Sequence, residues 1–309
     1  MNILGKVLTG SIIFGVVVWG TLTIFSNNAS SRRCNFSRNT PISKIETPIL
    51  SQEWGKSGMK STYGFKNKSG KWIIKPIYTF ARDFSEGLST VVLSGDWTTN
   101  KAVWGFIDKK GKLQFGKTFK YIEPFSDGLA LFSQGRFYGF INKSGKIVIK
   151  PQFTAFWSTF ENGYAPVQVS GYPDYKWGMI NYHGKFVIKP IYDYIKPFSD
   201  GLSQVKLNNK YGFVDKSGKI VIPIKFSSTH DFYEGLAGTY SEKYQKWGYI
   251  NKSGVFTIFP RFESVDDFYS GKAWVLLNGT SKLDTIEGEQ AFIDRTGKEL
   301  CRWKDKNGD

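Results

Sequence analysis

The chain has 309 residues, of which 17% are aromatic and 22% charged, and its formal net charge is +16. This composition excludes a disordered chain and is typical of a packed, strand-rich protein, because aromatic residues favour strands and bury large apolar surfaces. A chain of this length holds one large domain or two ordinary ones.

The first predicted element is an apolar segment, residues 7–25, which carries no charge and directly follows Lys6. Its length lies between a signal-peptide core and the roughly 20 residues of a membrane span. We therefore expect a signal peptide or an uncleaved membrane anchor, as a hydrophobic helix, in residues 1–30, and a linker in residues 31–53. Periplasmic or extracellular export is the favoured interpretation. Arg32, Arg33 and Arg38 leave a cytoplasmic-facing body open, because positive charge tends to stay inside.

Residues 54–303 repeat one pattern at periods of 34 to 43 residues. Each full copy begins with an aromatic residue and a glycine, continues through Asn or Asp to a corner glycine, and later contains a Phe-Ser-acid-Gly stretch or a variant of it. Self-similarity at this period predicts a repeat architecture. A seventh, partial copy has Ala291 in place of its first glycine, and residues 304–309 form a polar tail. The full copies begin at Tyr63, Trp104, Tyr138, Trp177, Tyr211 and Trp247.

A four-residue turn, such as Asn142 to Gly145, separates two short apolar runs in each copy. Asn or Asp first and Gly fourth favour a type I turn, so we predict a β-hairpin with a positive φ at the glycine. The Phe-Ser-acid-Gly stretch predicts a second tight turn, which sends a third strand toward the next hairpin, and residues 192–195 predict a fourth strand. The prolines after the hairpin, Pro76, Pro151 and Pro190, predict the end of its second strand. The other corner glycines include Gly70, Gly184 and Gly218.

Glycine followed by lysine also invites a phosphate-loop interpretation, but no Ser or Thr follows the lysine and a strand, not a helix, comes next. The pattern instead resembles the WG-repeat (KWG) family of bacterial β-repeat proteins over roughly residues 54–300. This resemblance implies a repeat scaffold, often at the cell envelope, with no shared reaction and no catalytic residues to transfer. We expect an all-β tandem repeat of small antiparallel units, six full and one partial, and favour a propeller-like ring over an open superhelical array.

Few residues support catalysis. The two histidines supply neither a metal site nor a histidine-based triad. Glu86, Asp127, Asp200 and Glu234 occupy equivalent turn positions, which indicates turn chemistry. We therefore predict a non-catalytic binding scaffold with no catalytic residues, no metal ligands and no cofactor. The alternative is an envelope enzyme, a glycan-directed hydrolase whose site lies in the variable loops.

Two sets of side chains could bind a partner. Lysines at hairpin corners would place positive charge at similar points of successive copies, which suits a protein or an anionic envelope polymer, although they could also serve only to solvate the turns. Aromatic residues of loops 94–103 and 170–176 would suit a carbohydrate or a peptide instead. The membrane is a further partner through the N-terminal segment, and nucleic acid is disfavoured. The lysines are Lys143, Lys146, Lys216 and Lys219, and the aromatic residues are Trp97, Tyr172 and Tyr175.

The two cysteines, Cys34 and Cys301, bracket the repeats. In an oxidising compartment they would join the two ends of the body by a disulfide. Cys301 also occupies the sequence position that Ile149 and Ile188 hold in other copies. It could therefore equally be a small buried hydrophobic residue.

Overall fold

The computed structural model describes residues 48–53, 61–98, 101–156, 158–169, 175–282 and 285–305. Every regular element within these ranges is a β-strand, which confirms the all-β prediction. No helix in the described part of the chain is long and apolar enough to cross a membrane. The membrane signal predicted over residues 7–25 lies outside the described ranges and stays a prediction.

The strands form seven antiparallel sheets that follow one another in chain order. The first three sheets are β1–β3 (Ile49–Glu53, Thr62–Lys66, Trp72–Tyr78), β4–β5 (Leu88–Ser94, Val103–Asp108) and β6–β8 (Leu129–Gln134, Phe137–Asn142, Ile147–Phe153). The next two are β9–β12 (Ala155–Phe156, Tyr164–Val169, Lys176–Asn181, Phe186–Tyr192) and β13–β16 (Tyr194–Ile195, Ser203–Leu207, Lys210–Val214, Ile220–Phe226). The last two are β17–β19 (Leu236–Ser241, Lys246–Asn251, Phe256–Phe262) and β20–β23 (Ser264–Val265, Lys272–Lys282, Thr285–Asp294, Glu299–Asp305).

Each sheet after the first combines strands from two successive sequence copies. The strand that leaves the Phe-Ser-acid-Gly turn of one copy pairs with the hairpin of the next, as β6 pairs with β7 and β14 with β15. β1 fills this place for the first hairpin, where Ile49 lies opposite Lys66. The linker prediction for residues 31–53 is therefore wrong for residues 49–53, because the first hairpin needs a preceding strand that no earlier copy supplies.

The hairpin corners have the predicted turn geometry. The N–H of Gly145 donates to the carbonyl of Asn142 at 2.8 Å, and the Asn142 side-chain oxygen accepts from the N–H of Lys146 at 3.0 Å. The φ of Gly145 is 74°, and the corner glycines of the other copies also have a positive φ. The predicted hairpin corner is thus confirmed, and its backbone groups bond to one another as in a turn.

The prolines do not end the second strand of the hairpin, and that prediction is wrong. β8 runs through Pro151, and β3 and β12 run through Pro76 and Pro190. β3, β8 and β12 are edge strands, so a proline, which has no N–H, can stand there without removing a hydrogen bond of the sheet. Beside each proline the pairing register with the neighbouring strand shifts, as it does at a β-bulge. The bulged backbone approaches the facing strand so closely that a Cβ on Gly139 would lie 2.5 Å from the Ile149 carbonyl oxygen. This close approach explains the glycine of the aromatic-Gly pair.

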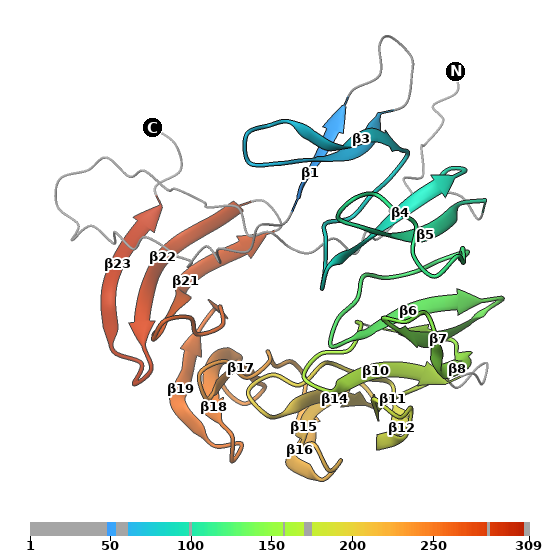
Figure 1. Cartoon of the computed structure of the whole chain (residues 1–309). Coiled ribbons are helices and arrows are strands. Elements are labelled where there is room, and N and C mark those ends of the chain that lie inside the picture. The colour runs from blue at the N-terminus through green and yellow to red at the C-terminus, as the bar shows by residue number, and fades with distance from the viewer. Residues whose placement is uncertain are drawn as a thin grey trace, which may run out of the picture.

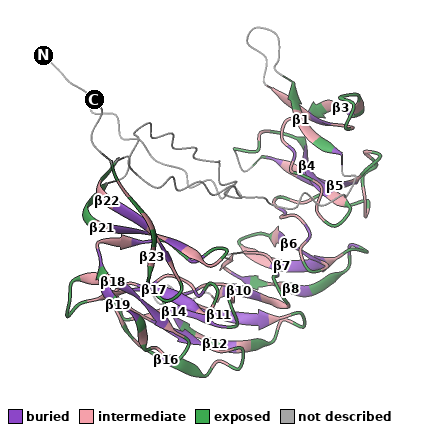
Figure 2. Cartoon of the chain, turned by 90° about the vertical axis from the view of Figure 1, so that its left-hand side faces the viewer, coloured by how far each residue is buried: buried purple, intermediate pink, exposed green. Residues whose placement is uncertain are grey.

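The hydrophobic core lies between neighbouring sheets. One cluster joins Leu131 and Phe140 of the sheet β6–β8 to Val167 and Ile180 of the sheet β9–β12, and all four side chains are fully buried. Figure 2 shows buried residues along the strands and exposed residues at the hairpin ends. A single sheet therefore has no core of its own and needs its neighbour.

The seven sheets are arranged along an arc that runs from β1–β3 to β21–β23, with β12, β16, β19 and β23 on its outside (Figure 1). Strands of successive sheets lie in contact, for example β8 with β10 and β16 with β17. No strand pair from the first and last sheets makes comparable contact within the described residues, so a closed ring is not shown. The seventh copy, predicted to be partial, contributes a complete hairpin, β22–β23.

Candidate binding site

A ladder of hydrogen bonds connects the Phe-Ser-acid-Gly turns of successive copies, and we call it the turn ladder. The Ser126 hydroxyl donates to the Phe160 carbonyl at 2.6 Å, and the Asp127 carboxylate accepts from the N–H of Gly163 at 2.8 Å. The same serine contact links Ser85 to Phe125 and Ser199 to Phe232, and the same carboxylate contact links Glu86 to Gly128, Asp200 to Gly235 and Glu234 to Gly271. These acids therefore stabilise the stack of sheets.

The hairpin corners reach the turn ladder of a more distant copy. Lys143, the second residue of its corner, lies 2.9 Å from the Glu86 carboxylate two copies earlier, and Lys252 lies 3.1 Å from Asp200 in the same way. In the fourth copy Tyr182 takes this position, where burial and a hydrogen bond to Asp127 raise the pKa of its hydroxyl. The corners are thus part of the packing between copies.

The four predicted lysines lie at two equivalent corners, those of β7–β8 and β15–β16. Lys143 forms the ion pair with Glu86, and Lys216 lies over the Tyr164 ring at 5.5 Å from its centroid. Lys146 and Lys219 are exposed. Since two of the four make contacts within the chain, their role as a binding face stays a prediction, and the structure adds a structural role for Lys143 and Lys216.

Aromatic side chains form a continuous row across the first three copies, which we call the aromatic row. Each ring lies within 6.3 Å, centroid to centroid, of the next, and the shortest distance is 5.0 Å between Tyr138 and Phe156. Outside the row, Trp97 packs on Phe80 at 4.8 Å. The members of the row, in order, are Tyr63, Phe80, Trp104, Tyr121, Tyr138 and Phe156.

The aromatic row borders a hollow of about 420 Å³, which we call the Tyr121 hollow. Trp97, Tyr121 and Tyr138 line it together with Lys120 and Ser133. The Tyr121 hydroxyl donates to the Glu123 carboxylate, which is itself paired with Arg82 of the preceding copy. Burial and the neighbouring Glu123 raise the pKa of Tyr121, so its hydroxyl stays protonated at neutral pH.

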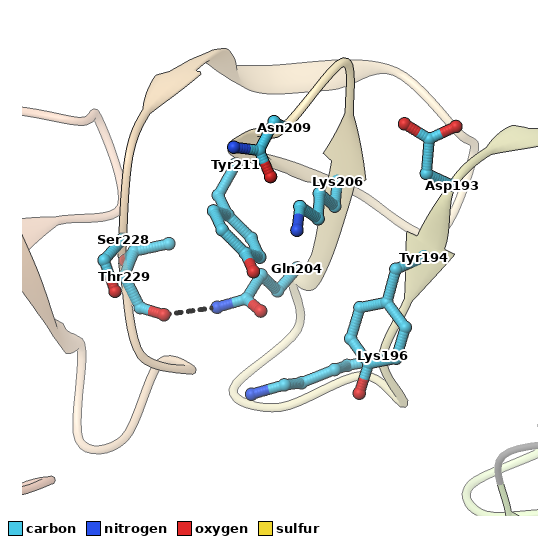
Figure 3. A pocket seen from close by; sticks show the side chains of 9 residues that line it. All are labelled: Asp193, Tyr194, Lys196, Gln204, Lys206, Asn209, Tyr211, Ser228 and Thr229. Carbon is cyan, nitrogen blue, oxygen red and sulfur yellow. Dashed lines mark hydrogen bonds between the residues drawn. The ribbon is translucent and has the colours of Figure 1, made fainter.

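A second hollow, of about 630 Å³, lies beside Tyr194 and is called the Tyr194 hollow (Figure 3). Tyr194 and Tyr211 stand on two of its sides, and the Lys206 ammonium lies 5.1 Å from the centroid of the Tyr211 ring. At its edge the Gln204 side-chain amide donates to the Thr229 carbonyl of the next copy at 2.7 Å. Burial, followed by the nearby Asp231, raises the pKa of Tyr194.

The two hollows occupy the same position of the repeat. Tyr121 and Tyr194 precede Phe125 and Phe198 of their turns by the same spacing. Tyr138 and Tyr211 begin the following copies in the same manner, and Ser133 corresponds to Lys206. The aromatic residue before the turn was a sequence signal for these sites. We missed it because its side chain forms a hollow only with residues of the next copy.

The remaining predicted residues do not join these hollows. Tyr175, which immediately precedes β11, is 42% exposed and lines neither hollow, whereas Trp97 of the other predicted loop does line one. Tyr172 and Cys34 lie outside the described residues. Cys301 is half-buried on β23 and is not a free thiol, and its pairing with Cys34 stays a prediction.

Comparison with known proteins places the repeat in a family. The WG containing repeat matches residues 63–97, 104–136, 138–172, 177–211, 211–239 and 247–280, which is more than half of the chain. No curated protein matches the sequence.

Solved structures show the fold alone. A structure of the eukaryotic initiation factor is 8% identical, with a TM-score of 0.51, over 85% of this chain and 78% of the other. Hsv2p of Kluyveromyces lactis is 9% identical, with a TM-score of 0.42, over 85% and 98% of the two chains. Puromycin hydrolase is 10% identical, with a TM-score of 0.34, over 78% and 50%. The last two scores are too low to support an argument. From its repeat matches and its seven linked sheets, the chain belongs to the WG-repeat family.

Proposed function

We propose that this chain is a binding scaffold without catalytic activity, and that its partner is an extended anionic polymer that lies across successive sheets. The observation that carries this proposal is the recurrence of one hollow at equivalent positions, beside Tyr121 and beside Tyr194. A partner with repeating units can occupy both hollows at once. When one polymer occupies both hollows, its overall affinity lies far above the affinity of either hollow alone.

The charge of the hollows favours an anion. Lys120 lines the Tyr121 hollow, and Lys196 and Lys206 line the Tyr194 hollow, where the Asp193 carboxylate is paired with Lys176. Lys196 is paired with Asp231 at 3.0 Å, whereas Lys120 is exposed on the surface of the chain. Because the whole chain carries a net charge of +16, it attracts polyanions at low salt over a distance of about a Debye length.

Affinity electrophoresis in gels that contain long or fragmented alginate, polyphosphate or polyglutamate tests this proposal. We expect at least one long polymer to retard the protein more than its short fragments do. Lys120→Gln or Lys206→Gln alone should abolish most of that difference, because either change removes one of the two linked sites. Equal retardation by long and short polymers would contradict a ligand that spans sheets. Shortening of the polymer during incubation would contradict the absence of catalysis.

The glycan-directed hydrolase remains the alternative function. Such an enzyme needs two carboxylates that face one another across a substrate. The turn acids Glu86, Asp127, Asp200 and Glu234 instead accept hydrogen bonds from glycine N–H groups of the next copy. None of the contacts in the described residues favours the hydrolase over the scaffold.

We also propose that the repeats are held at the cell envelope by residues 7–25, on the outer side of the cytoplasmic membrane. The support is the uncharged sequence of that segment. Protease added to intact cells should then degrade the repeats once any outer barrier is opened. Protection until the cytoplasmic membrane is lysed would instead show a cytoplasmic-facing body.

A further inference from the structure

We propose that the Tyr121 hollow is a subsite for an acidic polysaccharide, with Trp97 as the surface on which a sugar ring stacks and Lys120 as the contact for its carboxylate groups. This inference rests on the scaffold function proposed above and names the class of ligand. It concerns sugar chains whose rings carry carboxylates, such as β-linked uronic acids.

Trp97 presents an aromatic face at a fixed place. Trp97 is 41% exposed, yet its ring packs on Phe80 at 4.8 Å between centroids. The face of an aromatic ring is electron-rich, so it attracts the weakly positive C–H groups on the flat face of a pyranose. Because Phe80 already holds the indole, binding a sugar costs little further side-chain entropy.

The polar groups of the Tyr121 hollow suit the other parts of such a ligand. The Ser133 hydroxyl can donate to or accept from a sugar hydroxyl, whereas the Thr98 hydroxyl donates to Asp96 at 2.7 Å and can therefore only accept. The exposed Lys120 can pair with a carboxylate. No acidic side chain lines this hollow among the described residues. Glu123 lies next to it but is paired with Arg82, so its charge is compensated.

The Tyr194 hollow supplies a second, weaker subsite for the same chain. It has two tyrosines and Lys206, but its lining contains no tryptophan, and Asp193 adds a negative charge that Lys176 partly compensates at 2.6 Å. A polysaccharide repeats its ring and its carboxylate at a constant interval, so one long chain can reach both hollows, which lie two copies apart. A peptide of mixed sequence has no such repetition, which favours the sugar chain.

Calorimetric titration of the full chain with hexamannuronate tests the subsite. We expect binding that Trp97→Leu weakens about tenfold, because leucine keeps an apolar side chain but removes the aromatic face, and that Trp97→Phe largely restores. Lys120→Gln should also weaken binding and should reduce its dependence on salt concentration. The matched control is Tyr175→Leu, which removes an equally exposed aromatic ring outside the hollow and should leave binding unchanged.

Two further ligands separate the contribution of the sugar ring to binding from the contribution of its charge. Methyl-esterified hexamannuronate keeps the rings without the charges, and hexaglutamate keeps the charges without the rings. We expect both to bind more weakly than hexamannuronate. Equal binding of hexaglutamate, or equal losses for Trp97→Leu and Tyr175→Leu, would overturn the sugar subsite and leave the scaffold function standing. Failure of every anionic polymer to bind, long or short, would overturn both.

Discussion

Gly145 is held at its corner by two independent constraints. Its φ of 74° disfavours any residue with a Cβ, and a Cβ there would lie 2.7 Å from the Phe115 side chain of the preceding copy. Gly70, the same corner of the first copy, has a φ of 79° but no heavy atom within 4 Å of a Cβ position. The sequence predicts the first constraint from the turn pattern, whereas the second depends on how the copies stack.

We expect Gly145→Val to lower the free energy of unfolding by about 1–3 kcal/mol, because it adds backbone strain and overlap with Phe115. Urea denaturation followed by circular dichroism measures the change. Gly70→Val is the control, and it should cost less because only the backbone strain applies. A Gly145→Val variant as stable as the unsubstituted chain would contradict the turn assignment.

Asp231 and Asp215 should titrate at clearly different pH values. Burial raises the pKa of Asp231, even though Lys196 donates to it at 3.0 Å, whereas a hydrogen bond from the Ser217 hydroxyl lowers the pKa of Asp215. Ionised Asp215 therefore stabilises the folded state, and this contribution is lost as pH falls through the pKa of Asp215 in the folded chain. The contribution of Asp231 has the opposite sign. Burial disfavours its charged form, so ionised Asp231 destabilises the fold, and this cost is relieved as pH falls through the folded pKa of Asp231 toward its pKa in the unfolded chain. Carboxyl NMR titration, assigned with Asp231→Asn, checks this order, and the reverse order would refute it.

The hairpin is the element that the sequence predicts best. Its turn residues are local, so Asn142 and Gly145 suffice to predict it. The continuation of β8 through Pro151 was not predicted, because a proline interrupts a central strand but is tolerated at a sheet edge, and edge position is a property of the assembled sheet. The turn ladder was likewise not predictable in detail, since the partner of each acid lies in the next copy.

The turn ladder gives a prediction at the scale of one element. Glu234 and Ser270 occupy the same position of two consecutive turns and have φ values of 52° and 51°. The Glu234 carboxylate accepts a hydrogen bond from the N–H of Gly271 in the next turn at 2.9 Å, whereas Ser270 stands in the last such turn, which has no following turn to bond to. We expect Glu234→Ala to lower stability by about 0.5–1.5 kcal/mol, the net contribution of such a hydrogen bond. Ser270→Ala controls for the backbone conformation and should change stability less. Equal changes in the thermal midpoint of the two variants would show that the ladder bond adds nothing.

At the scale of the whole molecule, the sequence predicts the binding site only in part. Trp97 stood out as an aromatic residue in a long loop, and it does line a hollow. Tyr121, which precedes its turn, and Tyr138, on β7, were not identified as site residues, because a tyrosine that recurs at one position of a repeat is more often a core residue and their hollow arises between copies. The corner lysines were predicted as exposed charges, yet the pairing of Lys143 with Glu86 depends on a contact two copies apart.

The arc of sheets predicts a gradient of stability along the chain. Each inner sheet buries its core against two neighbours, whereas the first and last sheets have one described neighbour each. Because repeat proteins are stabilised mainly by contacts between adjacent units, terminal sheets should open more often. We expect backbone amides of β2 and β3 to exchange with deuterium faster than the equivalent amides of β11 and β12, measured by mass spectrometry under native conditions.

The contacts that link copies two apart, such as Lys252 with Asp200, should make the inner sheets open together rather than one at a time. Uniform protection of all seven sheets would contradict this gradient and would favour the closed ring, in which the first and last sheets protect one another.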